Sequence, residues 1–176
     1  MINITIIDTG CANLSSVKFA FDRLGYNTEI TFDLNKIKSA DKLILPGVGT
    51  ANAAMYNLQE RQLIETIQNL TQPVLGICLG MQLMTEFSEE GNVPTLNDTG
   101  LPLPQMGWNR VQFVKNCPLF DGIVQNSHFY FVHSYAVSPN EHSVAISNYG
   151  VNFSAAIAKE NFYGVQFHPE RSGKNG

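Results

Sequence analysis

Apolar positions in the first half of the chain change period several times. Four short runs have the apolar, partly β-branched composition of buried strands: residues 2–7, 28–32, 42–45 and 74–77. Between and after these runs, apolar residues recur at helical spacing, and we expect helices at residues 14–24, just before residue 42, at 51–70 and at 81–87. Strands that alternate with helices predict a parallel α/β sheet with flanking helices.

The second half of the chain has a different pattern. Proline, asparagine and glycine are frequent between Gly91 and Gly107, and we interpret this segment as a flexible connection within one domain. The segments after it resemble strands with no helices between them: residues 109–114, 129–132, 143–147, 154–158 and 163–167. We expect largely antiparallel strands that either extend the parallel sheet or form a smaller second sheet.

Composition and charge exclude several classes of protein. The chain has 176 residues, of which 44% are hydrophobic and 15% charged, and a net charge of −4, which suits one globular domain over residues 1–176. Lys and Arg form no cluster, so nucleic-acid binding is not expected. The N-terminus does not resemble a secretory leader, and no apolar run is long enough for a bilayer. We therefore expect a cytoplasmic protein that does not bind membranes.

The three cysteines, Cys11, Cys78 and Cys117, are an odd number without close pairing or the spacing of metal ligands, which disfavours a disulfide framework and a zinc site. The sequence predicts no metal and no cofactor. One of the cysteines could nevertheless be reactive while the others pack in the interior.

Cys78 has the strongest local signal for chemistry. It follows the apolar run 74–77 and is bracketed by Gly76 and Gly80, so it matches the Gly-x-Cys-x-Gly form of a nucleophile elbow. Glycines at these two positions allow a sharp strand-to-helix turn, and a helix N-terminus favours the thiolate over the thiol. The alternative is a buried structural cysteine between two glycines that let a helix pack closely.

A glycine-rich loop follows the third predicted strand, at Pro46-Gly47-Val48-Gly49-Thr50. If the strands before this loop and before Cys78 are neighbours, both lie at one edge of the sheet. The backbone N–H groups of the loop could then bind a phosphate or a developing oxyanion, although a simple tight turn would have the same sequence. The loop after the first strand, Asp8-Thr9-Gly10, does not match the dinucleotide-binding fingerprint.

Two histidines are candidates for the base that would accept a proton from Cys78. His168 ends an apolar strand and is followed by Pro169 and Glu170, and in extended chain residues two apart point to the same side. Glu170 could therefore orient His168, which would complete a nucleophile, base and carboxylate set. His133 is the competing base, but it lacks a carboxylate two residues away. The other histidines, at 128 and 142, have no motif around them.

Residues 76–82 (GICLGMQ) and 168–170 (HPE) together resemble the class I (triad) glutamine amidotransferases. Residues 46–49 (PGVG) match the oxyanion loop of that family. Within it, the motifs at residues 8–14, 106–109, 129–135 and 168–172 are similar to those of the glutaminase subunits of imidazole glycerol phosphate synthases, which serve histidine biosynthesis. This resemblance covers nearly the whole chain and implies a single-domain, flavodoxin-like α/β fold.

The resemblance also implies a role for particular residues. The catalytic positions are Cys78, His168 and Glu170, and the oxyanion positions are Val48, Gly49 and Leu79. The positions that bind the amino acid part of glutamine are Gly47, Gln82, Glu90, His133, Ser134 and Tyr135. The implied reaction is attack of the thiolate on the side-chain amide of glutamine, followed by hydrolysis of a thioester to glutamate.

The same resemblance implies a partner, a (βα)8-barrel cyclase subunit that receives the ammonia. It forms imidazole glycerol phosphate and an aminoimidazole carboxamide ribotide. Asn13, Trp108 and Tyr130 match interface positions, and Trp108 is the only tryptophan in the chain. Family members are nearly inactive until the partner binds its ligand, which suggests two arrangements of the loop 46–49.

The chain departs from the family pattern in two places. The resemblance implies a longer connection between Thr95 and Gly100 and a closing helix after Gly176. Three other functions are weighed against the main one: an amidotransferase subunit of anthranilate or aminodeoxychorismate synthase, a cysteine hydrolase or peptidase on the same elbow, and a non-catalytic flavodoxin-like scaffold. The first usually has histidine where Met81 stands and does not continue with Arg171.

Overall fold

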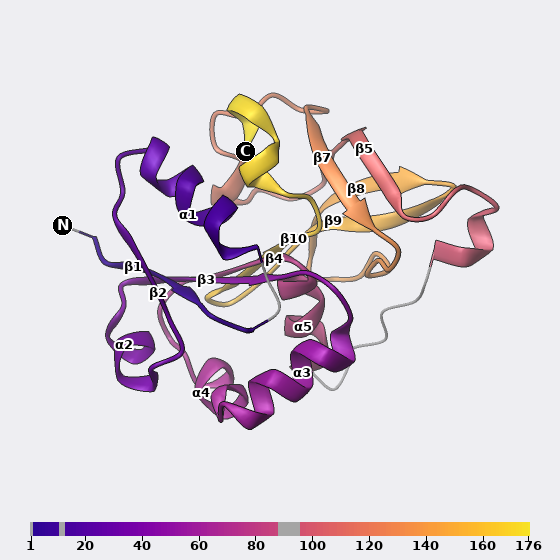
Figure 1. Cartoon of the computed structure of the whole chain (residues 1–176). Helices are drawn as coiled ribbons and strands as arrows, with labels where there is room; N and C mark the ends of the chain where they lie inside the picture. Colours follow the sequence, from indigo (N-terminus) through magenta and orange to yellow (C-terminus); the bar gives the residue numbers. More distant parts are fainter. Residues whose placement is uncertain (1, 11–12, 88–95) are drawn as a thin grey trace.

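An eight-stranded mixed sheet runs through the molecule, with a two-stranded ribbon beside it (Figure 1). The computed structural model describes residues 2–10, 13–87 and 96–176. The strands of the sheet are β1 (Ile4–Ile7), β2 (Thr28–Thr31), β3 (Lys42–Gly47), β4 (Val74–Cys78), β6 (Gln112–Phe113), β8 (Ser143–Tyr149), β9 (Val151–Lys159) and β10 (Phe162–Val165). Those of the ribbon are β5 (Gln105–Arg110) and β7 (His128–His133).

The parallel half of the sheet has the strand order β2-β1-β3-β4-β10. Every neighbouring pair in this half is parallel. This is the order in which flavodoxin-like sheets arrange five parallel strands, and ligands of such folds bind at the carboxyl ends of the strands. The predicted α/β fold is therefore confirmed.

Helices cover both faces of the sheet (Figure 1). Helix α1 (Leu14–Arg23) packs on one face through Val17, in the same apolar cluster as the aromatic side chains of the second half. The other face carries α2 (Leu34–Ser39), α3 (Ala51–Glu60), α4 (Leu63–Gln68) and α5 (Leu79–Phe87). Apolar side chains between these helices and the sheet form a second cluster, so the sheet is buried on both faces.

The prediction of one helix over residues 51–70 is wrong, because the chain breaks between α3 and α4 at Gln62, which has a left-handed φ of 57°. Leu58 and Leu63 are both fully buried. In one continuous helix, residues five apart would lie about 140° apart around the axis. The break lets both leucines face the sheet.

The second half is largely antiparallel, and both predicted arrangements occur. Strands β9, β8 and β6 extend the main sheet, whereas β5 and β7 form the separate ribbon. The single strand expected at residues 109–114 is wrong, since the chain passes from the ribbon to the main sheet at the buried Val111. Of the connection 91–107, the structure describes the part from residue 96 on, where residues 96–99 form a 3-10 turn with Leu96 buried and β5 begins at Gln105.

Strand β10 sets the geometry of the site. It is antiparallel to β9 but parallel to β4, with Val165 opposite Ile77. The carboxyl ends of β4 and β10 therefore meet at one edge of the sheet. Cys78, the last residue of β4, and His168, three residues after the end of β10, are brought together there although they are 90 positions apart in the sequence.

Candidate active site

Cys78 sits on a sharp turn between β4 and α5. Its φ is 54°, in the left-handed region that costs a non-glycine residue about 1–2 kcal/mol. A Cβ on Gly76 would lie 2.8 Å from backbone atoms of Gly80, and a Cβ on Gly80 would lie 1.8 Å from the Leu45 carbonyl oxygen. Both glycines are thus required by close backbone approach. A merely structural cysteine would not need this strained conformation, so the turn favours the nucleophile elbow.

The sulfur of Cys78 is nearly buried and faces several polar groups. Cys78 is 7% exposed, and its Sγ lies 3.7 Å from the Val132 carbonyl oxygen and 3.6 Å from Gln166 Nε2. His168 also lies close enough to interact with the thiol group, which raises the pKa of the imidazole. Leu79, the next residue, begins α5.

His168 projects from the chain just after β10, where its backbone N–H donates to the Tyr130 carbonyl oxygen at 2.8 Å. Its Nδ1 lies 2.9 Å from Glu170 Oε1. The predicted contact between these two side chains is therefore present, and His168 itself is extended as expected. The chain beyond it is not extended, because Pro169–Arg171 forms a 3-10 turn. The turn closes when Ser172 donates its hydroxyl to the His168 carbonyl oxygen at 2.7 Å.

Burial and two neighbouring groups act on His168 in opposite directions. Burial disfavours the imidazolium, but hydrogen bonds to Cys78 and Glu170 and the negative charges of these groups outweigh it, and they raise the pKa of His168 to about 10. The site therefore favours a protonated imidazole between Cys78 and the carboxyl group of Glu170. This is the arrangement that a cysteine nucleophile needs.

Glu170 is a buried carboxylate with little other support. Its side chain is 7% exposed, and in the part of the chain that the structure describes, its Oε2 has no hydrogen-bond partner. A cavity of about 240 Å³ lies beside Glu170, between α1 and the sheet, and has room for water. Within the described residues, the imidazole of His168 is the group that compensates the carboxylate.

The glycine-rich loop lies at the same edge of the sheet as Cys78, as expected. Gly47 pairs with Cys78 in the register of β3 and β4, and a Cβ on Gly47 would meet Leu79 Cβ at 2.9 Å. Beyond Gly47 the loop leaves the sheet, with Val48 and Gly49 exposed and a φ of +94° at Gly49.

His133, the competing base, is held by structural hydrogen bonds. Its Nδ1 lies 2.8 Å from the Tyr135 carbonyl oxygen, and its Nε2 lies 2.8 Å from the side-chain amide of Gln105. Burial lowers the pKa of His133 to about 4, and the nearby positive charge of His168 adds to this effect. A neutral imidazole whose two nitrogens are both engaged is a poor candidate for the base.

Gln82 connects the elbow helix to the predicted substrate strand. Its Nε2 donates to the Tyr135 carbonyl oxygen at 3.1 Å and to Gln166 Oε1 at 2.9 Å. Ser134 is half-buried and the Tyr135 side chain is exposed. Glu90 lies outside the described residues. Sequence reasoning did not single out Gln166, although a glutamine inside the apolar strand that leads to His168 was a usable signal.

The three predicted interface residues are all accessible. Asn13 is exposed and accepts a hydrogen bond from the Ser16 N–H at the start of α1. Trp108 on β5 is 56% exposed and makes an edge-to-face contact with the half-buried Tyr130, with ring centroids 6.1 Å apart. Met106 on the same strand is 66% exposed. Trp108 and Met106 give the ribbon an exposed apolar surface.

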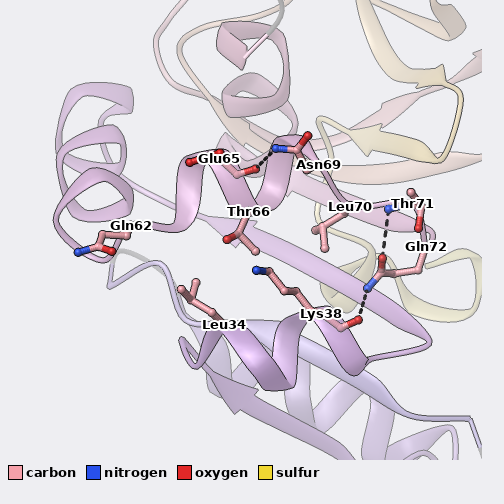
Figure 2. A pocket seen from close by; sticks show the side chains of 9 residues that line it. All are labelled: Leu34, Lys38, Gln62, Glu65, Thr66, Asn69, Leu70, Thr71 and Gln72. Carbon is pink, nitrogen blue, oxygen red and sulfur yellow. Dashed lines mark hydrogen bonds between the residues drawn. The ribbon is translucent and has the colours of Figure 1, made fainter.

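A second cavity, of about 470 Å³, lies between α2 and α4 (Figure 2). Its lining runs along both helices to the residues just before β4, and Cys78 is not part of it. Gln72 at its rim donates through Nε2 to the carbonyl oxygens of Ile37, Lys38 and Ala40. These hydrogen bonds satisfy backbone carbonyl groups at the C-terminal end of α2, so the role of Gln72 is structural.

Neither a metal cluster nor a membrane span is found in the described residues. No group of three or more His, Cys, Asp or Glu side chains there could hold a metal ion. No helix there is both long and apolar enough to cross a bilayer. Cys78 and Cys117 are free thiols, and Cys11 lies outside the described residues.

Comparisons with known proteins agree on one family. The model of the class-I glutamine amidotransferases matches residues 5–176. The imidazole glycerol phosphate synthase subunit HisH of Haemophilus influenzae is 95% identical over 186 residues, covering 100% of this chain and 94% of the relative. The same subunit of Mannheimia succiniciproducens is 71% identical, covering 97% and 93%. In fold, the glutaminase domain of Trypanosoma brucei CTPS with bound acivicin aligns with a TM-score of 0.71 at 17% identity, covering 99% of this chain and 88% of that one.

Proposed function

The chain belongs to the class-I glutamine amidotransferase family, and from this we propose that it hydrolyses glutamine as the glutaminase subunit of an imidazole glycerol phosphate synthase. One observation supports this chemistry most directly: Cys78, on a strained elbow, interacts with His168, and Nδ1 of that histidine is hydrogen-bonded to the buried carboxylate of Glu170. The relatives at 95% and 71% identity carry the assignment to this particular synthase.

In the first step the Cys78 thiolate attacks the side-chain amide carbon of glutamine. A carbon–sulfur bond forms, and the amide oxygen becomes an oxyanion. The Leu79 N–H and an N–H of the Val48–Gly49 segment would stabilise that charge, which is the usual role of preorganised backbone donors. The register of β3 and β4 supports this pairing, since it sets the loop beside the elbow.

In the second step the tetrahedral intermediate collapses and the carbon–nitrogen bond breaks. The His168 imidazolium gives its proton to the departing nitrogen, which leaves as ammonia. The products are a neutral imidazole and a γ-glutamyl thioester on Cys78. A histidine that is protonated in the resting site is suited to this step.

In the third step His168 must act as a base, and formation of the thioester itself makes this possible. Cys78 raises the pKa of His168 through a hydrogen bond and through its charge. A thioester sulfur carries no charge and is a poor hydrogen-bond acceptor, so both contributions are lost. The pKa of His168 then falls, and the neutral ring takes a proton from water as the hydroxide attacks the thioester carbon. Breaking the carbon–sulfur bond releases glutamate and restores the thiolate and imidazolium.

The amino acid part of glutamine would bind at Gln82, His133, Ser134 and Tyr135, with Gly47 below it. Both N–H groups of the Gln82 amide are used by Tyr135 and Gln166. This leaves its carbonyl oxygen to accept from the α-ammonium group of the substrate. His133 would serve as a neutral support for the strand and not as a base.

We further infer that ammonia passes to a (βα)8-barrel cyclase subunit that covers the site. Asn13, Trp108 and Tyr130 would meet this partner, and the exposure of Trp108 and Met106 on the ribbon supports a docking surface there. Activation by the partner would require it to reorient the exposed loop 46–49. The activity also suits the cytoplasm, where free thiols such as Cys78 and Cys117 stay reduced.

The test measures glutamate release by the chain mixed with the cyclase subunit and its nucleotide ligand. The native chain should release glutamate much faster in the complex than alone, and Cys78→Ala should release none. The Cys78→Ala complex should still make imidazole glycerol phosphate from added ammonium salt, which controls for folding and assembly. Equal glutaminase rates for native and Cys78→Ala would refute the proposal.

A further inference from the structure

Gln166 is a fully buried polar side chain beside the nucleophile. It is 0% exposed, and its backbone N–H donates to the Ala155 carbonyl oxygen at 2.9 Å, which extends the pairing of β10 with β9. Because Val165 is opposite Ile77, Gln166 comes next to Cys78 on the adjacent strand. A fully buried amide at this place must be hydrogen-bonded, and its partners indicate what it does.

The hydrogen bonds around Gln166 fix the orientation of its amide group. The Tyr135 backbone carbonyl can only accept, so the Gln82 atom that faces it, 3.1 Å away, is the donor nitrogen. The same Gln82 nitrogen lies 2.9 Å from the Gln166 amide, which must therefore present its oxygen there. The Gln166 NH2 group is consequently left to donate to Cys78 Sγ, at 3.6 Å.

We propose that Gln166 is a positioning residue for the Cys78 thiolate: its amide, oriented by Gln82, donates a hydrogen bond to the sulfur. The inference deepens the proposed function and rests on Cys78 acting as the nucleophile. The Val132 carbonyl on the other side of the sulfur can accept from a thiol but cannot donate to a thiolate. An ionised sulfur can therefore be stabilised by the Gln166 side of the site and not by Val132.

This arrangement also links substrate binding to the nucleophile. Gln82 belongs to the proposed substrate site and holds the Gln166 oxygen. A ligand that fixes the Gln82 amide thereby fixes the donor that faces the sulfur. The backbone carbonyl of Tyr135 also holds the Gln82 amide. Hydrogen bonds therefore connect the predicted substrate strand to Cys78 through Gln82 and Gln166.

The test measures the rate at which iodoacetamide alkylates Cys78 as a function of pH, with peptide mass spectrometry to separate Cys78 from the other cysteines. Gln166→Met keeps the length of the side chain but removes the donor, and the midpoint of the pH dependence should rise by about one unit. Gln166→Glu keeps an acceptor for Gln82 but places a carboxylate against the sulfur, and the midpoint should rise further. In the complex with the cyclase, kcat should fall about tenfold for Gln166→Met with KM within about threefold.

Ser154→Ala is the matched control, because Ser154 is 0% exposed on the adjacent strand β9 and hydrogen-bonds to Ser143 at 2.7 Å, away from the sulfur. It should lose stability without moving the alkylation midpoint. A merely structural Gln166 would behave like Ser154, so unchanged midpoints in the Gln166 variants would overturn the inference.

A second measurement requires no change at Gln166. The side-chain NH2 resonances of Gln166 should shift through the Cys78 titration in the native chain, and this shift should be absent in Cys78→Ala. Gln166 NH2 resonances that do not shift as Cys78 titrates would also overturn the inference. Neither readout uses glutamine, so they separate failure of this inference from failure of the proposed glutaminase activity.

Discussion

The ends of strands β7 and β10 each place a histidine in the interior, and the two histidines differ in charge. His133 is 5% exposed and His168 is 8% exposed, so burial disfavours the imidazolium at both. Yet the pKa is lowered to about 4 at His133 and raised to about 10 at His168. Burial therefore does not decide which histidine is charged.

The partners of the two rings explain the difference. His133 faces a backbone carbonyl and the neutral amide of Gln105, neither of which carries a full charge. His168 faces a carboxylate on one side and a thiol that can ionise on the other. Two similar strand ends thus produce a neutral structural support and an ionised acid–base group, and the following predictions test this contrast.

The largest expected effect separates the two histidines in catalysis. His168→Gln should lower kcat for glutamate release in the complex about 10³-fold, because it removes the group that moves protons in two steps. His133→Gln should change mainly KM and lower kcat by less than about tenfold. Steady-state rates of both variants measure this directly. Comparable losses of kcat would mean that His133 also acts as an acid or base.

The next effect concerns stability in acid. The pKa of His133 is about 4 in the folded chain and ordinarily 6.5, so the unfolded chain binds a proton first as the pH falls. The stability that depends on neutral His133 is complete above pH 6.5. It is lost as the pH falls toward 4, by about 3 kcal/mol in all.

Urea unfolding of the native chain and of His133→Gln between these pH values checks the size of that loss. The native chain should lose more free energy of unfolding over this range than the variant does. Parallel pH profiles would show that His133 does not titrate as the contacts imply.

A smaller effect is expected when the carboxylate at the other strand end is neutralised. Glu170→Gln keeps the shape of the side chain but removes one of the two negative groups that hold the imidazolium. We expect kcat to fall on the order of 10²-fold and the pKa of His168 to fall. The dependence of the rate on pH measures both changes. A profile for Glu170→Gln that matches that of the native chain would show that Glu170 has no role in the mechanism.

The smallest effect should fall on one strand end and leave the other unchanged. Cys78→Ala removes the contributions of the thiol to His168, whose pKa should fall by about one unit or more. His168 still carries its positive charge at the pH where His133 titrates, so the pKa of His133 should stay about 4. Nuclear magnetic resonance titration of the imidazole protons follows both. Equal shifts of the two pKa values, or none at His168, would contradict the account.

Local sequence pattern was sufficient for those parts of the site that depend on local backbone geometry. The turn at Cys78 needs glycines at 76 and 80, because the backbone packs too closely there for a Cβ atom. The two glycines in the sequence therefore predict this turn directly. The neighbouring positions of β3 and β4 followed from the usual pairing of sequential strands. The fold class likewise followed from the alternation of strands and helices.

Features that depend on tertiary contacts could not be read from the pattern. The break at Gln62 comes from the need to bury both Leu58 and Leu63 against one sheet. The 3-10 turn after His168 depends on Ser172, whose hydroxyl bridges the His168 carbonyl and the Tyr130 N–H. Gln166 was missed because it comes beside Cys78 only through the register of β10 against β4, which the sequence does not give.

The central claim is that Cys78 is the nucleophile and that glutamine is its substrate. A chloroketone analogue of glutamine, added to the complex with the cyclase, tests both parts at once. The account predicts one label per chain, located on Cys78 by peptide mass spectrometry, with glutaminase activity lost in proportion and protection by excess glutamine. Activity that persists after complete labelling of Cys78, or inactivation with the label on Cys117, would contradict it.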